Sequence, residues 1–96
     1  MQDSARRACA LLKALSNESR LLVLCQLARG EATVGELHAH VGLSQSALSQ
    51  HLARLRELGL VAARRSGRNV YYSIASRAAA AVIGTLYREF CGSDCD

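Results

Sequence analysis

The feature that most constrains the fold is a pair of short amphipathic segments separated by a three-residue break. Residues 33–42 begin with threonine and glutamate at the spacing of a capping box and end on a glycine, which predicts a short helix. Residues 44–59 begin with a serine cap and also end on a glycine, which predicts a longer helix. Two helices joined in this way form a helix-turn-helix. The inward face of the second helix consists of Leu48, Leu52 and Leu55.

A β-hairpin is expected directly after this pair of helices. Residues 61–65 and 70–74 are predicted strands around a four-residue loop, 66–69, that contains glycine and asparagine. The alternation of the second strand turns three of its side chains inward. These are Val70, Tyr72 and Ile74.

Three further helices are expected, over residues 3–15, from residue 16 or 17 to 30, and from 76 to about 90. The second of these is apolar nearly all round, which predicts the buried centre of the fold. The last carries a long apolar stripe with no obvious partner in the chain, which suits a dimer interface. The stripe consists of Ala79, Val82, Ile83, Leu86, Tyr87 and Phe90.

The expected fold class is therefore mainly α with a small β-hairpin, placed between the fourth and fifth of five helices. A chain of 96 residues has room for one domain, so residues 1–96 are expected to form a single domain that contains this helix-turn-helix. A chain this small buries too little surface to be very stable alone, which favours a homodimer through the terminal helices.

The positive charge of the chain is concentrated in one third of it. Residues 44–77 hold six arginines and one glutamate, a net charge of six minus one, or +5. The whole chain holds twelve basic and eight acidic residues, or +4, which leaves −1 for the rest. A preference for arginine over lysine can come from coding bias, but such bias does not explain the clustering. The cluster indicates a surface that meets a polyanion.

The outward face of the 44–59 helix carries short polar groups that both donate and accept hydrogen bonds. Glutamine can pair with adenine edges in the major groove, and serine with either kind of group. Arginines on the following hairpin suit the phosphate backbone. A polar helix face is by itself usually just solvated. The order of helix, turn, helix and basic hairpin is more specific, and it predicts binding to double-stranded DNA.

Three runs of sequence resemble the ArsR family of winged-helix repressors over nearly the full chain. They read ALSNESRLLVL, VGELHAHVGLSQSALSQHLARLRELGLV and ARRSGRNVYYSI. The resemblance implies a homodimeric repressor that binds an imperfect palindromic operator and releases it when an inducer meets the dimer. It also implies the residues of the DNA interface. Those on the reading helix are Gln45, Ser46, Ser49, Gln50 and His51, and the expected backbone contacts are Arg54, Arg64 and Arg68.

The metal sites of that family are not expected here. Its arsenic and cadmium site needs two thiols in an E-L-C-x-C run, which in this chain contains His38 and His40 instead. Side chains two apart on a helix point about 200° from each other, so these histidines cannot chelate one ion. The family's zinc site needs Asp and His ligands on the last helix, and residues 76–90 contain neither. We therefore expect no metal site and no cofactor.

Thiols remain as candidate sensors. Cys25 and Cys91 stand in L-C-Q-L and E-F-C settings that resemble the sulfide- and persulfide-responsive members of the family, the BigR and SqrR type. That resemblance implies a redox-sensing pair with reactive sulfur species as inducer. By itself, Cys25 among leucines reads as a small buried hydrophobe. Cys9 and Cys95 are expected to be accessory, but Cys91 and Cys95 at helical spacing could share arsenite, so an arsenite-responsive repressor stays open.

A thiol-dependent redox enzyme is the alternative from another class. A nucleophilic Cys91 would need a nearby base or a positive helix end, yet it stands at a negative carboxyl end beside Glu89 and Asp94. We therefore expect no enzyme activity. The chain has neither a long apolar run nor an apolar signal core, so we expect a cytoplasmic protein without membrane association.

Overall fold

The computed structural model describes residues 2–91, and of Cys91 only its place at the end of a helix. Five α-helices, one two-stranded antiparallel sheet and a terminal π-helical turn make up this part of the chain. The predicted fold class, a mainly α winged helix-turn-helix, is confirmed. The elements are α1 (Gln2–Leu15), α2 (Glu18–Leu27), α3 (Val34–His40), α4 (Gln45–Glu57), β1 (Val61–Ser66), β2 (Asn69–Ile74), α5 (Arg77–Leu86) and η1 (Tyr87–Cys91).

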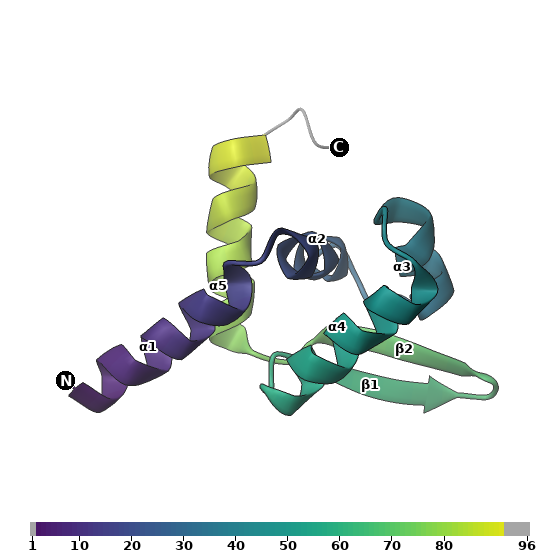
Figure 1. The fold of residues 1–96 in the computed structure, drawn as a ribbon, viewed down its shortest axis with the longest axis horizontal. Coiled ribbons are helices and arrows are strands. Elements are labelled where there is room, and N and C mark those ends of the chain that lie inside the picture. The colour runs from purple at the N-terminus through teal and green to yellow at the C-terminus, as the bar shows by residue number, and fades with distance from the viewer. Residues whose placement is uncertain (1, 92–96) are drawn as a thin grey trace.

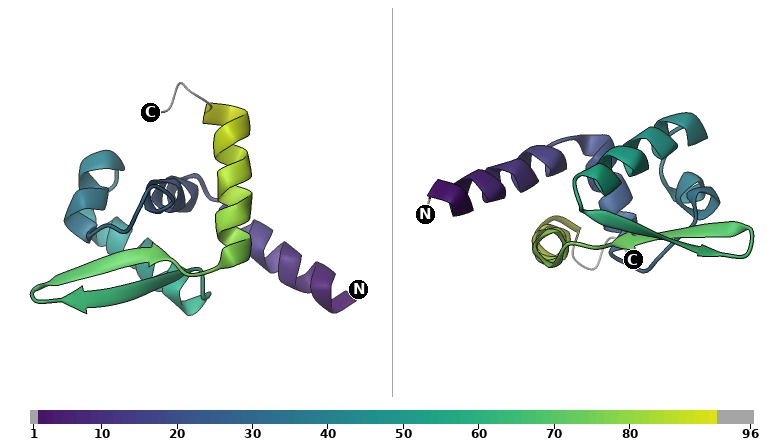
Figure 2. Two further views of the ribbon diagram at one scale, coloured as in Figure 1. Left: turned by 180° about the vertical axis from the view of Figure 1, so that it is seen from behind. Right: turned by 90° about the horizontal axis from the view of Figure 1, so that it is seen from below.

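The elements are divided between two sides of a central helix. Figure 1 shows α2 in the middle, with α3, α4 and the hairpin on one side and α1 and α5 on the other. The tip of the hairpin and the amino-terminal end of α4 lie toward the same end of the molecule, and the view from behind in Figure 2 agrees. The helix-turn-helix and its wing are thus separated from the two terminal helices.

Four helices begin with a side-chain cap, close to the starts that the sequence predicts. At each cap a side-chain oxygen accepts a hydrogen bond from the backbone N–H three residues later, at 3.0 to 3.1 Å. The capping box at the start of α3 is complete, because the Thr33 N–H also donates to Glu36 Oε1 at 2.9 Å. These bonds satisfy N–H groups that a helix start leaves unpaired. The four caps are Asn17, Thr33, Ser44 and Ser76.

The reading helix α4 ends in a complete Schellman motif. Gly59 adopts φ +76°, and its N–H donates to the Arg56 carbonyl at 3.0 Å. The Leu60 N–H donates to the Leu55 carbonyl at 2.9 Å, and both leucine side chains are buried. This pattern of two bonds around a left-handed residue is why glycine stands at position 59.

The core lies where α2, α3, α4 and α5 meet. Leu24 and Ile83 are fully buried in it, and Leu37 is 1% exposed. The predicted inward face of α4 is confirmed. Its members, Leu48, Leu52 and Leu55, are 0%, 1% and 0% exposed.

The hairpin is tighter than the sequence predicts. Each strand extends one residue further, so Ser66 pairs with Asn69 and only Gly67 and Arg68 form the turn. Gly67 has φ +62° and Arg68 does not have a positive φ, as a type II′ turn requires. Such two-residue turns match the right-handed twist of the strands, so the predicted four-residue loop is wrong by one residue at each end.

The inward side of β2 is confirmed at two of three positions. Tyr72 and Ile74 pack against the core, and Val70, close to the tip of the hairpin, is half-buried. Val70 pairs with Arg65, one pair from the end of the hairpin, where the strands extend beyond the helices (Figure 1).

The second helix is buried on one side rather than all round. Val23, Leu24 and Leu27 are buried, whereas Leu22 is 49% exposed. The expectation of all-round burial is therefore wrong at Leu22. Apolar composition alone does not say how many sides of a helix the rest of one chain can cover.

The apolar stripe of the last helix is divided between core and surface. Ala79 and Ile83 are fully buried, Val82 and Leu86 are half-buried, and Phe90 is 83% exposed. The α-helix also ends earlier than predicted, at Leu86, and continues as the π-helical turn Tyr87–Cys91.

A side-chain hydrogen bond precedes this change of helix type. The Thr85 hydroxyl donates to the Ala81 carbonyl at 3.0 Å. A threonine that bonds four residues back competes with the helix's own N–H group for the carbonyl and loosens the turn. None of the helices in the described part of the chain is long and apolar enough to cross a bilayer.

We predict that Gly59→Ala destabilises the fold by about 1 kcal/mol, because the left-handed conformation costs a residue with a Cβ about that much free energy. Gly42→Ala is the matched control, since Gly42 also has open space around a Cβ but no positive φ. Urea unfolding at equal protein concentration measures both. Equal stability of the two variants would contradict the role given to the backbone at position 59.

Candidate DNA interface and thiol positions

Most of the predicted reading positions of α4 are exposed. Gln45, Ser46, Ser49 and Gln50 are exposed, and His51 is half-buried. Ser46 and Gln50 lie on the side of α4 opposite the buried leucines, whereas Gln45 and His51 stand three residues before and after Leu48 and flank the leucine face. Packing of the leucines therefore determines the direction in which the polar face points.

The hairpin carries exposed cations next to this face. Arg68 is exposed and lies in the two-residue turn, at the most distant point of the wing (Figure 1). Arg65, which pairs with Val70 across the hairpin, is also exposed. A cation at the tip of a protruding hairpin can reach a phosphate that the helices cannot.

Arg54 lies on the exposed side of α4. Its Nη1 forms an ion pair with Glu57 Oε1 at 3.2 Å, and both side chains are more than half exposed. Exposed pairs of this kind contribute about 1 kcal/mol or less. Arg54 can therefore leave Glu57 for a phosphate at little cost.

Arg64 is held differently from the other arginines of the wing. Its Nη2 donates to Glu31 Oε1 and its Nε donates to Glu31 Oε2 at 3.3 Å. The guanidinium carbon also lies 4.9 Å from the centre of the Tyr71 ring. The hydrogen bonds to Glu31 and its negative charge raise the pKa of Arg64 above its usual value. The charge of Arg64 is thus already paired with a carboxylate of the same chain, although the side chains of Arg64 and Glu31 are 56% and 43% exposed.

Sequence reasoning included Arg64 but missed its partners. Glu31 is 33 positions away along the chain, and no spacing rule connects the two. Tyr71 could have been found, because Arg64 and Tyr71 are directly opposite in the hairpin register. The contact with Glu31 depends on the tertiary fold alone.

The two cysteines of the expected sensing pair lie on different helices. Cys25 belongs to α2, is half-buried and packs against the core. Cys91 is the last residue of η1, and its side chain lies outside the described part. In Figure 1 the end of η1 lies above the level of α2. Cys9 is exposed on α1, and Cys95 lies outside the described residues.

The histidines of α3 are both on the surface. His38 and His40 are exposed, and they form the carboxyl-terminal turn of that helix. Within residues 2–91, no three His, Cys, Asp or Glu side chains are grouped in a way that could hold a metal ion.

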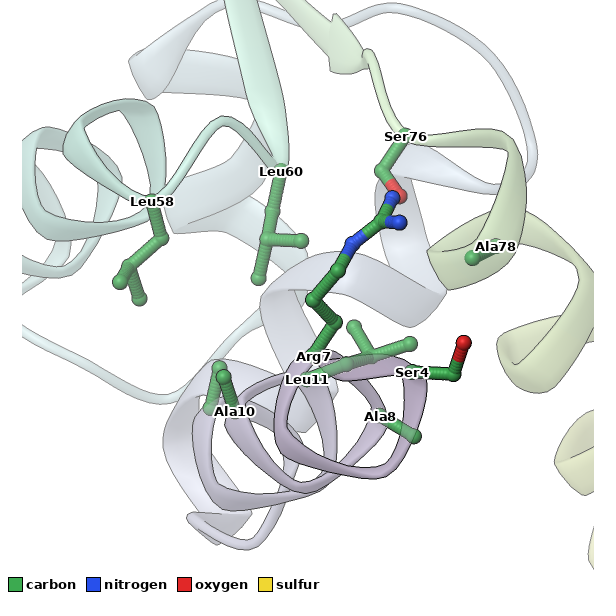
Figure 3. A pocket seen from close by; sticks show the side chains of 10 residues that line it. Ser4, Arg7, Ala8, Ala10, Leu11, Leu58, Leu60, Ser76 and Ala78 are labelled. Atoms are coloured by element: carbon green, nitrogen blue, oxygen red, sulfur yellow. The ribbon is translucent and has the colours of Figure 1, made fainter. Parts of the chain in front are cut away.

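A groove of about 470 Å³ separates α1 from the α4–β1 turn and the start of α5. Figure 3 shows Arg7 extending across it from α1 toward Ser76. Apolar and small side chains form most of its walls. They include Ala8, Leu11, Leu58, Leu60 and Ala78.

Residues 17–63 match the model of the arsR family of bacterial regulatory proteins. The chain belongs to the ArsR family. It is 47% identical to the transcriptional activator HlyU of Vibrio cholerae over 95% of this chain and 84% of that protein. The resemblance to the ArsR family is thereby confirmed, and its members among the similar proteins are regulators of transcription. This ArsR-family chain is accordingly a regulator and not an enzyme.

Solved structures of ArsR-family proteins share the fold over nearly the whole chain. Reduced HlyU from Vibrio cholerae gives a TM-score of 0.90 at 47% identity and covers 95% of this chain and 96% of that one. The repressor BigR from Xylella fastidiosa gives 0.89 at 38% identity, covering 100% and 95%. The expected likeness to BigR is confirmed.

Proposed function

We propose that this ArsR-family chain is a homodimeric repressor that binds a palindromic operator and is released from it by reactive sulfur species. One observation supports the DNA-binding part of this proposal. The polar face of α4 is exposed beside a basic wing tip, while its leucine face is fully buried. In this family of folds such a helix enters the major groove, and the wing contacts the backbone.

The roles of the interface residues follow from their chemistry. The amide groups of Gln45 and Gln50 can read base edges, assisted by Ser46, Ser49 and His51. Arg54 and Arg68 supply phosphate contacts, which set the register and give salt-dependent affinity. The charge of +5 in residues 44–77 supports this division.

We predict that Gln50→Ala narrows the difference in affinity between operator and unrelated DNA, by about 1–3 kcal/mol for a lost bidentate contact. Arg68→Ala is the matched comparison. It should weaken binding to every sequence and lower the slope of log affinity against log salt by about 0.9. Fluorescence polarisation at several salt concentrations measures both quantities. If both variants bound like wild type, this docking of α4 and the wing would be wrong.

The terminal helices support a second copy of the chain as partner. Only Ala14 and Leu15 of α1 are buried, whereas Leu12 is 56% exposed and Phe90 of η1 is 83% exposed. The groove beside α1 also remains open (Figure 3). Exposed large apolar side chains on both terminal segments are what an interface with a second copy would cover. A palindromic operator needs two reading helices one DNA turn apart, which a twofold dimer provides.

We predict that Leu12→Glu yields a monomer and abolishes specific DNA binding together, because it places a charge in the interface without entering the core. Ala39→Glu is the control, since it adds the same charge at an exposed position on α3. Light scattering and operator binding at micromolar concentration test both proteins. A wild-type chain that is monomeric under these conditions would overturn the dimer.

Thiol chemistry supports the choice of inducer. A thiolate of one cysteine takes the outer sulfur of an organic persulfide and releases the organic thiol. The new protein persulfide then joins the second cysteine, while another persulfide molecule accepts the two hydrogens and leaves as thiol and hydrogen sulfide. The product is a trisulfide between Cys25 and Cys91. A direct disulfide needs alpha carbons within about 7 Å, whereas the additional sulfur spans a wider gap.

The position of Cys25 explains how such a bridge would reach DNA. It lies on α2, which packs against α1 on one side and α3, α4 and β2 on the other. A bridge to the last helix would move that helix relative to α2 and change the spacing of the two reading helices. Solved HlyU, a relative at 47% identity, is described in a reduced form, which agrees with thiol chemistry in this part of the family.

We predict that organic persulfide releases operator DNA from wild type and from Cys9→Ser, but not from Cys25→Ser or Cys91→Ser. Intact mass should rise in the first two by one sulfur less two hydrogens. Release from either of the latter variants would contradict the paired-thiol mechanism. If arsenite released DNA and persulfide did not, the alternative repressor with Cys91 and Cys95 as ligands would replace it.

A further inference from the structure

We propose that Glu31 positions the wing by holding Arg64, so that Arg64 braces the hairpin and does not neutralise a DNA phosphate. The inference rests on the proposed DNA-binding function. It assigns a role to Glu31, which lies in the connection between α2 and α3, outside both the reading helix and the hairpin.

The contact between the two side chains uses both carboxylate oxygens. Arg64 Nη2 donates to Oε1 and Nε donates to Oε2, so the carboxylate meets one edge of the guanidinium. Two parallel bonds between these groups fix direction as well as distance. A phosphate that took Arg64 would first have to displace a carboxylate bound at two points.

The Tyr71 ring supports the guanidinium from a second direction. Arg64 and Tyr71 face each other across the hairpin, and the guanidinium carbon lies 4.9 Å from the ring centre. Arginine stacked on a ring has less freedom to swing outward. Arg64 is therefore held by the carboxylate along one edge and by the ring on one face.

The backbone next to Glu31 is tied to the same hairpin. The Ala32 N–H donates to the Tyr72 carbonyl at 3.0 Å, and the Tyr72 N–H donates to the Ala32 carbonyl at 2.8 Å. Ala32 and Tyr72 face inward, so the preceding Glu31 shares the outer face with Tyr71 and Arg64. The α2–α3 connection thus acts as a short third strand whose carboxylate reaches past β2 to β1.

The charge of Glu31 cancels that of Arg64. Glu31 and Arg64 together contribute no net charge, whereas Arg68 lies alone in the turn at the tip. The wing consequently presents its positive charge at the tip rather than along its outer face. Specific binding gains from this arrangement, because a mobile extra cation would strengthen contacts to every DNA sequence alike.

The test measures affinity for operator and for an unrelated duplex as a function of salt. We expect the neutral double variant Glu31→Gln/Arg64→Gln to keep the wild-type slope of log affinity against log salt. Glu31→Gln alone should release Arg64, steepen the slope by about 0.9 and tighten binding to the unrelated duplex several-fold in low salt. Arg68→Ala is the reference for one lost phosphate contact.

Two results would overturn the proposal. One is a double variant whose slope falls as much as that of Arg68→Ala, which would make Arg64 a phosphate contact. The other comes from amide hydrogen exchange in the DNA-free protein. Glu31→Gln should speed exchange at the Ala32 and Tyr72 amides. Unchanged exchange rates at these amides would show that Glu31 does not brace the hairpin. The hydrogen-exchange experiment needs no DNA. If the wild-type protein failed to bind operator, the proposed function would be contradicted, but hydrogen exchange would still test whether Glu31 braces the hairpin.

Discussion

The burial of three leucines on α4 is the interaction on which the rest of the molecule depends. Leu48, Leu52 and Leu55 are almost wholly removed from solvent, and truncation of one such side chain to alanine costs about 2–5 kcal/mol. Their packing fixes the rotation of α4 about its own axis. Gln50 therefore points away from the core, and the hairpin that follows the Schellman motif at Gly59 begins in a fixed direction.

The central helix lies between two groups of elements. On one side of α2 lie the polar face of α4 and the wing, and on the other lie α1 and α5 (Figures 1 and 2). Cys25 is part of this central helix and packs against the hydrophobic core of the protein. In the proposed mechanism, a chemical change at Cys25 shifts the elements on both sides of α2. A coupling of about 1–3 kcal/mol is typical of such linked sites and changes operator affinity by one to two orders of magnitude.

Features that depend on neighbours in sequence were predictable. The caps at Thr33 and Ser44 and the leucine face of α4 rest on spacings of three and four residues, and the structure contains all of them. Features that depend on the packing of distant segments were not. The exposure of Leu22 and the attachment of Arg64 to Glu31 are set by which elements meet in space.

NMR titration of the isotopically labelled wild-type protein with an operator duplex tests the central claim most directly. The account predicts that the side-chain amide signals of Gln45 and Gln50 and the backbone signals of Gly67 and Arg68 shift at substoichiometric DNA, with the exposed positions of α1 unaffected. Shifts confined to α1 and α5, with the signals of α4 and the hairpin tip unchanged, would contradict it.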